Sequence, residues 1–232
     1  MTNFDPVVDD YDAARPSYPA SVYDALEPLG GARVVEGGAG TGIATRALRA
    51  RGAAVVAIDI GEGMLRRLDG WRLVADAADA PLRDGCADLV CFAQCWHWLD
   101  LDVASGECAR ILRGGGRWAA WWNHARGDGE AWFEAYWDVL EDSTGARRAH
   151  RDTNWGNTLD PALFTTPVKT AHPWVREVSV ASWLTDQRSH SYIGLDDKHD
   201  VMAELERILR DEFGDGPVRC RYETWLWVAA KR

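Results

Sequence analysis

The first half of the chain alternates short apolar runs with segments of helical periodicity. Runs rich in β-branched and aromatic residues predict strands at 33–36, 53–59, 73–76, 88–92 and 117–122. Residues 42–51 and 100–113 lie between such runs and carry apolar side chains at helical spacing. Strands that alternate with helices at this pace predict parallel pairing through right-handed crossovers. We therefore expect a Rossmann-like, doubly wound α/β sheet with helices on both faces.

The second half is less regular, and twelve of the thirteen tryptophans lie beyond residue 90. Its pattern predicts helices at 130–142, 182–188 and 198–213, and strands near 174–180 and 219–229. A further helix is expected around 20–26, after a segment that Pro16 and Pro19 hold extended. The segment 145–167 is rich in Asn, Gly and Pro, which favours a loop or lid. With these elements the sheet has seven strands, mostly parallel.

The domain organisation follows from the absence of a repeat or linker in the 232 residues. We expect a single domain, because this length suffices for one sizeable core. Within it, residues 1–30 would form an N-terminal helical cap and residues 31–125 the cofactor-binding core. Residues 126–232 would supply the lid, the helices on the acceptor side and the final strands.

The net charge of −10 disfavours proteins held on nucleic acid or anionic lipid, because both need clustered positive charge. No apolar run approaches the roughly 18 residues of a membrane span, and the first residues lack the basic and apolar stretches of a signal peptide. The five cysteines have no framework spacing and are interpreted as reduced thiols. We expect a cytoplasmic monomer or homodimer that binds neither nucleic acid nor membranes.

Residues 34–43 lead a predicted strand directly into a glycine-rich turn and then a helix. Glycine permits positive φ and a close approach of ligand to backbone. In doubly wound sheets the ligand crevice lies at the carboxyl ends of the strands. Asp59 ends the second predicted strand about 20 residues past the glycines, where an acid accepts hydrogen bonds from ribose hydroxyls. Together these features predict a nucleoside-binding crevice.

The spacing of the glycines indicates which kind of nucleoside ligand the crevice would bind. A dinucleotide fingerprint needs Gly or Ala where this chain has Ile43 or Thr45, which disfavours the alternative of an NAD-linked oxidoreductase. The observed pattern is acid-x-G-x-G-x-G, from Glu36 to Gly42. A carboxylate at this place repels a pyrophosphate and attracts an ammonium group. The pattern therefore suits a nucleoside that carries an amino acid.

The ordered motifs resemble those of the class I S-adenosylmethionine-dependent methyltransferases. The chain looks most like their type 11 small-molecule branch, which includes trans-aconitate methyltransferase-like enzymes. The similar segments are 34–42, 59–65, 76–82, 88–98 and 107–116, with 11–19 and 188–192 resembling elements near the two ends of that branch. Two of the motifs depart from the family pattern. The first has Glu36 where Asp is commoner and Gly37 before Gly38 where a hydrophobic residue is usual, and the second has Gly61 where Ser is usual.

The resemblance implies S-adenosyl-L-methionine as cofactor and S-adenosyl-L-homocysteine as product. It assigns cofactor binding to Tyr11, Arg15, Glu36, Gly38, Ala39, Gly40, Gly42, Asp59, Ile60, Met64, Asp76, Ala77 and Gln94. Glu36 and the glycine backbone would receive the methionine portion, with Arg15 near its carboxylate. Asp59 would hold the ribose, and Gln94 would lie beside the sulfonium. The adenine would lie among Ile60, Met64, Asp76 and Ala77.

His97 is the candidate general base, because it ends the fourth predicted strand at the crevice. The alternative is that it only lines the acceptor pocket. A sulfonium is already an activated donor, so positioning supplies most of the rate, and a carboxylate acceptor needs no base. We expect methyl transfer to an oxygen of a small molecule, under a lid formed by 145–167 and the region of Arg188. A regulatory module that binds the cofactor without catalysis is the remaining alternative.

Three further groups of residues have side chains that could bind a metal, a substrate or an apolar ligand. Cys91, Cys95 and His97 would alternate onto one strand face, but the sequence supplies no fourth ligand, so no metal site is expected. His190 and Tyr192 are candidates for substrate contact. The tryptophans at 118, 121, 122, 132, 137 and 155 are expected mainly in the core, with some lining an apolar acceptor pocket.

Overall fold

The computed structural model describes residues 15–147, 156, 158–190, 193 and 199–232. The elements in chain order are α2 (Ala20–Asp24), β1 (Arg33–Gly37), α3 (Ile43–Ala50), β2 (Ala54–Asp59), α4 (Glu62–Leu65), β3 (Arg72–Val74), β4 (Ala87–Ala93), the short 3-10 helix η2 (Trp96–Trp98), α5 (Leu101–Ile111), β5 (Leu112–Ala125), α6 (Ala131–Thr144), β6 (Val168–Val178), α7 (Val180–Arg188), α8 (His199–Phe213) and β7 (Val218–Ala230). The strands form one seven-stranded sheet in the order β3-β2-β1-β4-β5-β7-β6. Strands β1 to β5 pair in parallel, and β7 runs antiparallel to both β5 and β6. The expected mostly parallel, seven-stranded α/β fold is confirmed.

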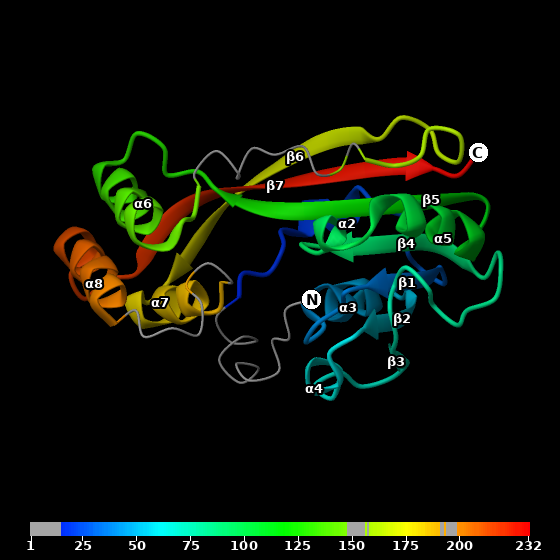
Figure 1. Ribbon diagram of the computed structural model, residues 1–232, viewed down its shortest axis with the longest axis horizontal. Coiled ribbons are helices and arrows are strands. Elements are labelled where there is room, and N and C mark those ends of the chain that lie inside the picture. The colour runs from blue at the N-terminus through cyan, green and yellow to red at the C-terminus, as the bar shows by residue number, and fades with distance from the viewer. Residues whose placement is uncertain (1–14, 148–155, 157, 191–192, 194–198) are drawn as a thin grey trace.

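Helices cover both faces of the parallel part of the sheet (Figure 1). Successive side chains of a strand point to opposite faces, so Val34 and Cys91 pack with α2 and α3. Their neighbours Val35 and Phe92 pack with α5 on the other face. Because both faces are covered, these strands are continuous apolar runs, which is the pattern seen in the sequence.

Helices α6, α7 and α8 form a separate group, here called the helical lobe, at one end of the long antiparallel strands (Figure 1). Their buried side chains make a hydrophobic cluster of their own with the first half of β7, from Val218 to Tyr222. The lobe is thus attached to the parallel part of the sheet by continuous strands. Within the described residues, no helix has both the length and the apolar character needed to cross a membrane.

Two strands are longer than the sequence pattern predicts. Strand β5 begins at Leu112, before the predicted start at residue 117. The glycines at 114–116 do not end the strand but lie in an irregularity within it, where the pairing with β4 shifts register. Strand β6 begins at Val168, before the predicted start near residue 174. Its first four residues are exposed along the sheet edge and show no alternation of buried and exposed side chains. An exposed edge strand lacks the apolar signal on which the prediction depended.

The end of β4 corrects one expectation from the sequence. The strand stops at Ala93, and Gln94 takes a positive φ of 63° before η2 begins. Cys95 and His97 therefore lie beyond the strand, and the predicted alternation with Cys91 onto one strand face is wrong. Cys95 Sγ donates instead to the backbone oxygen of Gly37, at 3.1 Å. Among the described residues, no group of three or more His, Cys, Asp or Glu could hold a metal ion.

Candidate active site

The loops after β1, β2 and β4 meet at one edge of the sheet, because these strands are adjacent and parallel. Asp59, the last residue of β2, holds two of these loops. Its Oδ2 accepts a hydrogen bond from Gly40 N and its Oδ1 accepts one from Gly61 N, both at 2.8 Å. A carboxylate has about four lone-pair sites, so Asp59 retains capacity for a ligand's hydroxyl groups.

The glycine turn after β1 leaves one open position. Gly38, Gly40 and Gly42 have φ values of 62°, 56° and 88°. A Cβ at Gly38 would collide with Cys95, and one at Gly42 would collide with Leu68. A Cβ at Gly40 would meet no atom within 4 Å. Two of these glycines are thus required by packing, whereas Gly40 faces space that a ligand can fill.

Glu36 places a carboxyl group beneath this turn. The side chain is buried, with 1% exposure, and accepts a hydrogen bond from the Thr45 hydroxyl. Burial raises the pKa of Glu36 to about 7, against the opposing effect of the Thr45 hydrogen bond. An approaching cation would favour the ionised form of this carboxyl group.

A small cleft, here called the glycine cleft, opens against the turn and has a volume of about 60 Å³. It brings together six residues that the family resemblance assigns to the cofactor: Arg15, Glu36, Gly38, Ala39, Gly40 and Gln94. Pro16, Tyr18, Thr41, Ile43, Ala44 and Ala93 complete its lining. Residues from three separate segments therefore converge where the methionine portion was expected.

Other predicted cofactor residues lie outside the glycine cleft. Ile60 is 44% exposed, and Asp76 is exposed with its Oδ1 accepting from Ala78 N at 2.9 Å. Met64 is buried at 5% exposure, as expected for a residue in the core side of its helix. Tyr11 lies outside the described residues. The proposed adenine contacts of Ile60, Met64, Asp76 and Ala77 stay predictions.

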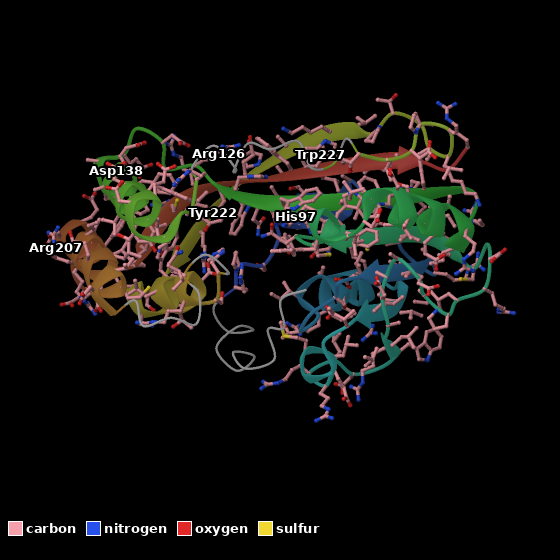
Figure 2. The ribbon with its side chains drawn as sticks, in the orientation of Figure 1. His97, Arg126, Asp138, Arg207, Tyr222 and Trp227 are labelled. Atoms are coloured by element: carbon pink, nitrogen blue, oxygen red, sulfur yellow. The ribbon has the colours of Figure 1, made fainter. Side chains whose placement is uncertain are left out.

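A second, larger cavity of about 540 Å³ lies between the sheet edge and the helical lobe, and is here called the aromatic cavity. Its aromatic lining consists of Trp98, Trp122, Phe133, Tyr136, Trp137, Trp183 and Tyr222. Figure 2 shows His97 and Tyr222 near the middle of the molecule, between the helices at its two ends. Arg15, Pro16 and Gln94 line both this cavity and the glycine cleft, so the two spaces adjoin at these residues.

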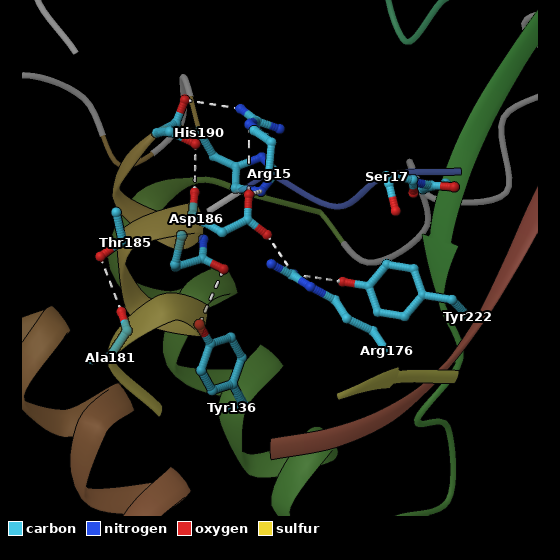
Figure 3. Close-up of polar contacts among 12 residues, drawn as sticks. Arg15, Ser17, Tyr136, Arg176, Ala181, Thr185, Asp186, His190 and Tyr222 are labelled. Carbon is cyan, nitrogen blue, oxygen red and sulfur yellow. Dashed lines mark hydrogen bonds and ion pairs between the residues drawn. The ribbon is translucent and has the colours of Figure 1, made fainter. Parts of the chain in front are cut away.

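Two charged residues in the lining of the aromatic cavity, Arg15 and Asp186, belong to a network of polar contacts (Figure 3). Asp186 of α7 accepts a hydrogen bond from Arg176 of β6 at 2.5 Å, and both side chains are buried. Arg15 Nε lies 3.5 Å from the same carboxylate, and Arg15 Nη2 donates to the backbone oxygen of Ser189 at 3.0 Å. Burial, together with Arg15, lowers the pKa of His190 to about 3, so this imidazole is neutral at physiological pH. Sequence analysis missed Arg176 and Asp186.

Two consecutive residues of β5 orient the polar side chains that follow β4. Trp122 Nε1 donates to His97 Nδ1 at 3.1 Å, and Asn123 N donates to Gln94 Oε1 at 3.3 Å. Burial lowers the pKa of His97 to about 4. His97 lies on η2 rather than at the end of the strand, and it lines the aromatic cavity.

The lining of the aromatic cavity tests several expectations. Trp122 and Trp137 line it, as do Gly145, Ala146 and Arg147 at the start of the predicted lid. The tryptophans at 118, 121 and 132 are buried. Residues 148–155, including Trp155, and Tyr192 lie outside the described residues. Phe133 and Tyr136 were missed, although with Trp137 they have i, i+3, i+4 spacing on α6, which marks one helix face.

Comparison with known proteins finds methyltransferases. Residues 35–120 match the family model for the methyltransferase domain. An uncharacterized methyltransferase of Mycobacterium bovis is 42% identical over 126 residues, and the match covers 52% of this chain and 52%, about half, of the relative's length. An uncharacterized methyltransferase-like protein of Schizosaccharomyces pombe is 29% identical, with 90% of this chain and 87% of that protein covered.

The fold is also found among solved structures. That of a proposed type II methyltransferase from Anaeromyxobacter dehalogenans superposes with a TM-score of 0.74 at 24% identity, covering 94% of this chain and 97% of the other. The finer resemblance to trans-aconitate methyltransferase-like enzymes stays a prediction. The chain is thus similar to class I S-adenosylmethionine-dependent methyltransferases, through the match of residues 35–120 to the methyltransferase domain and through its fold.

Proposed function

We propose that this protein transfers the methyl group of S-adenosylmethionine to an oxygen atom of a small-molecule acceptor. The observation that supports this most directly is the junction of the glycine cleft and the aromatic cavity at Arg15, Pro16 and Gln94. A methyl donor in the cleft and an acceptor in the cavity would face each other at that junction. Holding donor and nucleophile in line supplies most of the rate enhancement that such a reaction needs.

The residues of the glycine cleft suit the methionine end of the donor. The buried Glu36 carboxyl group would bind its ammonium group, and the Arg15 guanidinium its carboxylate. The open side of Gly40 leaves room for the ligand, and Asp59 would accept from its ribose hydroxyls. Ile60, Met64, Asp76 and Ala77 would surround the adenine. The donor, when bound, supplies a methyl group already activated by its sulfonium.

The aromatic cavity supports a small acceptor with an apolar or aromatic body. Its volume of about 540 Å³ lies within the range of small-molecule sites, and aromatic rings dominate its lining. His97 and His190 have pKa values lowered to about 4 and about 3, so both imidazoles are weak bases. Weak bases favour an acceptor oxygen that is already ionised or readily loses its proton.

We also propose where the protein is located in the cell and how its domain is organised. All five cysteines are free, and the net charge is −10, which supports a cytoplasmic protein with a small-molecule partner. The chain would act as a single domain, with residues 1–30 as cap, 31–125 as cofactor-binding core and 126–232 on the acceptor side. Residues 145–167 and the region of Arg188 would form the lid.

Transfer of labelled methyl from S-adenosylmethionine into pooled small-molecule extracts tests the proposal. We expect label in small molecules with the native protein and less label with Asp59→Ala at a donor concentration below saturation. Calorimetry with S-adenosylhomocysteine reports cofactor binding separately. Binding without any transferred label would instead support a regulatory module, and tighter binding of NADH than of S-adenosylhomocysteine would support an oxidoreductase.

A further inference from the structure

The polar side chains at the junction of the two cavities are held from the neighbouring strand. Gln94 and His97 follow β4, and their orientations are set by Asn123 and Trp122, which are consecutive residues of β5. Both Gln94 and His97 line the aromatic cavity, and Gln94 also lines the glycine cleft. The same short segment of β5 thus decides which polar atoms these two side chains present.

The Trp122 contact determines the tautomer of His97. An indole N–H can only donate, so the imidazole Nδ1 that faces it at 3.1 Å must be unprotonated. The burial that lowers the pKa of His97 to about 4 keeps the ring neutral at physiological pH. A neutral imidazole with Nδ1 unprotonated carries its proton on Nε2. His97 therefore has an N–H donor at Nε2 and no base there.

The Asn123 contact determines the orientation of the Gln94 amide in the same way. A backbone N–H can only donate, so the amide atom facing it at 3.3 Å is the oxygen, and the NH₂ group is directed elsewhere. Gln94 also holds a φ of 63°, which is unusual for a residue with a side chain. Backbone strain of this kind is typical of positions that clamp a ligand.

We propose that Gln94 and His97 form a pair of N–H donors that binds a carboxylate of the acceptor, and that His97 acts in acceptor binding instead of as a general base. This inference rests on the proposed methyl transfer. The charges of the cavity agree with an anionic acceptor. Arg147 lines it, and the carboxylate of Asp186 in its lining is shared between Arg176 and Arg15. Two donors beside cationic groups match the two oxygens of a carboxylate.

A carboxylate acceptor makes the transfer complete without a base. One carboxylate oxygen accepts from the donor pair while the other forms a bond to the methyl carbon. The bond from that carbon to sulfur breaks, and its electron pair stays on sulfur. The products are a methyl ester and a neutral thioether, and no proton moves. A hydroxyl or amine acceptor would have to lose a proton, which the Nε2–H of His97 cannot accept.

The tautomer is tested directly by the ¹⁵N resonances of His97 in the uniformly labelled full-length protein, assigned with His97→Gln. We expect the Nε2–H tautomer throughout pH 5 to 8. The Nδ1–H tautomer would overturn the donor role, and titration to imidazolium with a midpoint between pH 6 and 7 would overturn the assignment of Nδ1 as the acceptor from Trp122. This measurement needs no substrate, so it decides the inference even if methyl transfer is not observed.

The chemistry of the labelled product, together with matched variants, tests whether the methyl acceptor is a carboxylate. Label transferred into pooled small-molecule extracts should be released as methanol by mild alkali, as from a methyl ester, and alkali-stable label would overturn the proposal. With the labelled acceptor purified, His97→Phe should raise its KM about 10- to 100-fold, since a hydrogen bond to a charged group is lost. His97→Gln, which can donate but cannot act as a base, should stay within about fivefold of the native protein.

The remaining variants separate the two proposals. Gln94→Glu keeps an oxygen for Asn123 N but faces the acceptor with negative charge, so it should raise KM by more than about 100-fold. His172→Asn, on β6 with its ring contacting Thr170 and Ser21, is the control for loss of a histidine and should leave KM unchanged. Loss of activity in His97→Gln as deep as in His97→Phe would show a base. Absence of label in every fraction would contradict methyl transfer itself, while the ¹⁵N tautomer would still decide the donor role.

Discussion

If Glu36 binds the ammonium group of the methyl donor as proposed, binding of the donor should depend on pH. Its pKa in the unliganded protein is raised by burial from 4.5 to about 7. The donor's ammonium group binds the ionised carboxylate, so affinity should rise as pH increases through this pKa. We expect affinity for S-adenosylhomocysteine to increase about tenfold between pH 6 and pH 8, with proton release on binding below pH 7. Calorimetry in buffers of different ionisation enthalpy measures both quantities.

The control for this prediction is Glu36→Gln, which keeps the shape and removes the titrating group. This variant should bind more weakly, and its affinity should no longer change between pH 6 and pH 8. A flat profile in the native protein would contradict the proposed contact between Glu36 and the ammonium group.

Asp59 is expected to contribute to both cofactor binding and the stability of the glycine turn. Asp59→Ala removes the acceptor for Gly40 N and Gly61 N as well as the proposed ribose contacts. Affinity for S-adenosylhomocysteine should fall by about 1–3 kcal/mol, and the free energy of unfolding by about 1–2 kcal/mol. Calorimetry and urea denaturation measure the two effects. Asp79→Ala, at an exposed neighbouring position, should change neither.

At the level of single residues, the sequence was most informative where a motif combines chemistry with local backbone geometry. Glu36 and Asp59 could be predicted because each ends a β-branched strand beside glycines. Asp186 and Arg176 could not, because their meeting depends on packing α7 against β6. The tautomer of His97 was equally hidden, since it depends on a tryptophan 25 residues away on the next strand.

The glycine turn provides a prediction at the level of an element. Gly40→Ala places its Cβ in open space, so its cost to stability is the strain of a left-handed backbone, about 1–2 kcal/mol. Gly42→Ala has the same strain and also drives its Cβ into Leu68. Urea denaturation should therefore show a larger loss for Gly42→Ala. Calorimetry should show the larger loss of cofactor affinity for Gly40→Ala; the opposite order would mean that the open side of Gly40 does not face the ligand.

The existence of every element in the described sheet could be predicted from periodicity, whereas some boundaries could not. The glycines at 114–116 are typical of a turn, yet β5 pairs with β4 on both sides of them, at Leu112 and at Arg117, so the strand continues through them. At Val168 the side chains are exposed on an edge strand, so only the pairing with β7 reveals the strand. In both cases a tertiary hydrogen-bond ladder overrides the local sequence signal.

At the level of the whole molecule, Asp186 joins three segments that are distant in sequence. Its carboxylate contacts Arg176 of β6, Arg15 of the N-terminal segment and, at 3.8 Å, His190 after α7. Asp186→Asn would leave two buried guanidinium groups without their counter-ion. We expect the free energy of unfolding in urea to fall by about 3–5 kcal/mol.

An exposed ion pair supplies the comparison for Asp186. Glu206→Gln removes the partner of Arg210 on the surface of α8, where both side chains are about half exposed. Its effect on the unfolding free energy should be below about 1 kcal/mol. Equal effects of Asp186→Asn and Glu206→Gln on the unfolding free energy would show that the Asp186 carboxylate does not stabilise the packing of β6, α7 and the N-terminal segment.

Strand β5 combines two tasks along one continuous length. Trp121 packs in the core between the sheet and α2, while the next two residues orient Gln94 and His97. Under the proposed role of Gln94 and His97, a substitution in this part of β5 would change folding and acceptor recognition together, which restricts the residues that the strand can accept there. Helices α6 and α7 reach the same cavity from a separate hydrophobic cluster. New acceptors should accordingly evolve, and be engineered, through those two helices, with the methyl donor's cleft inherited unchanged.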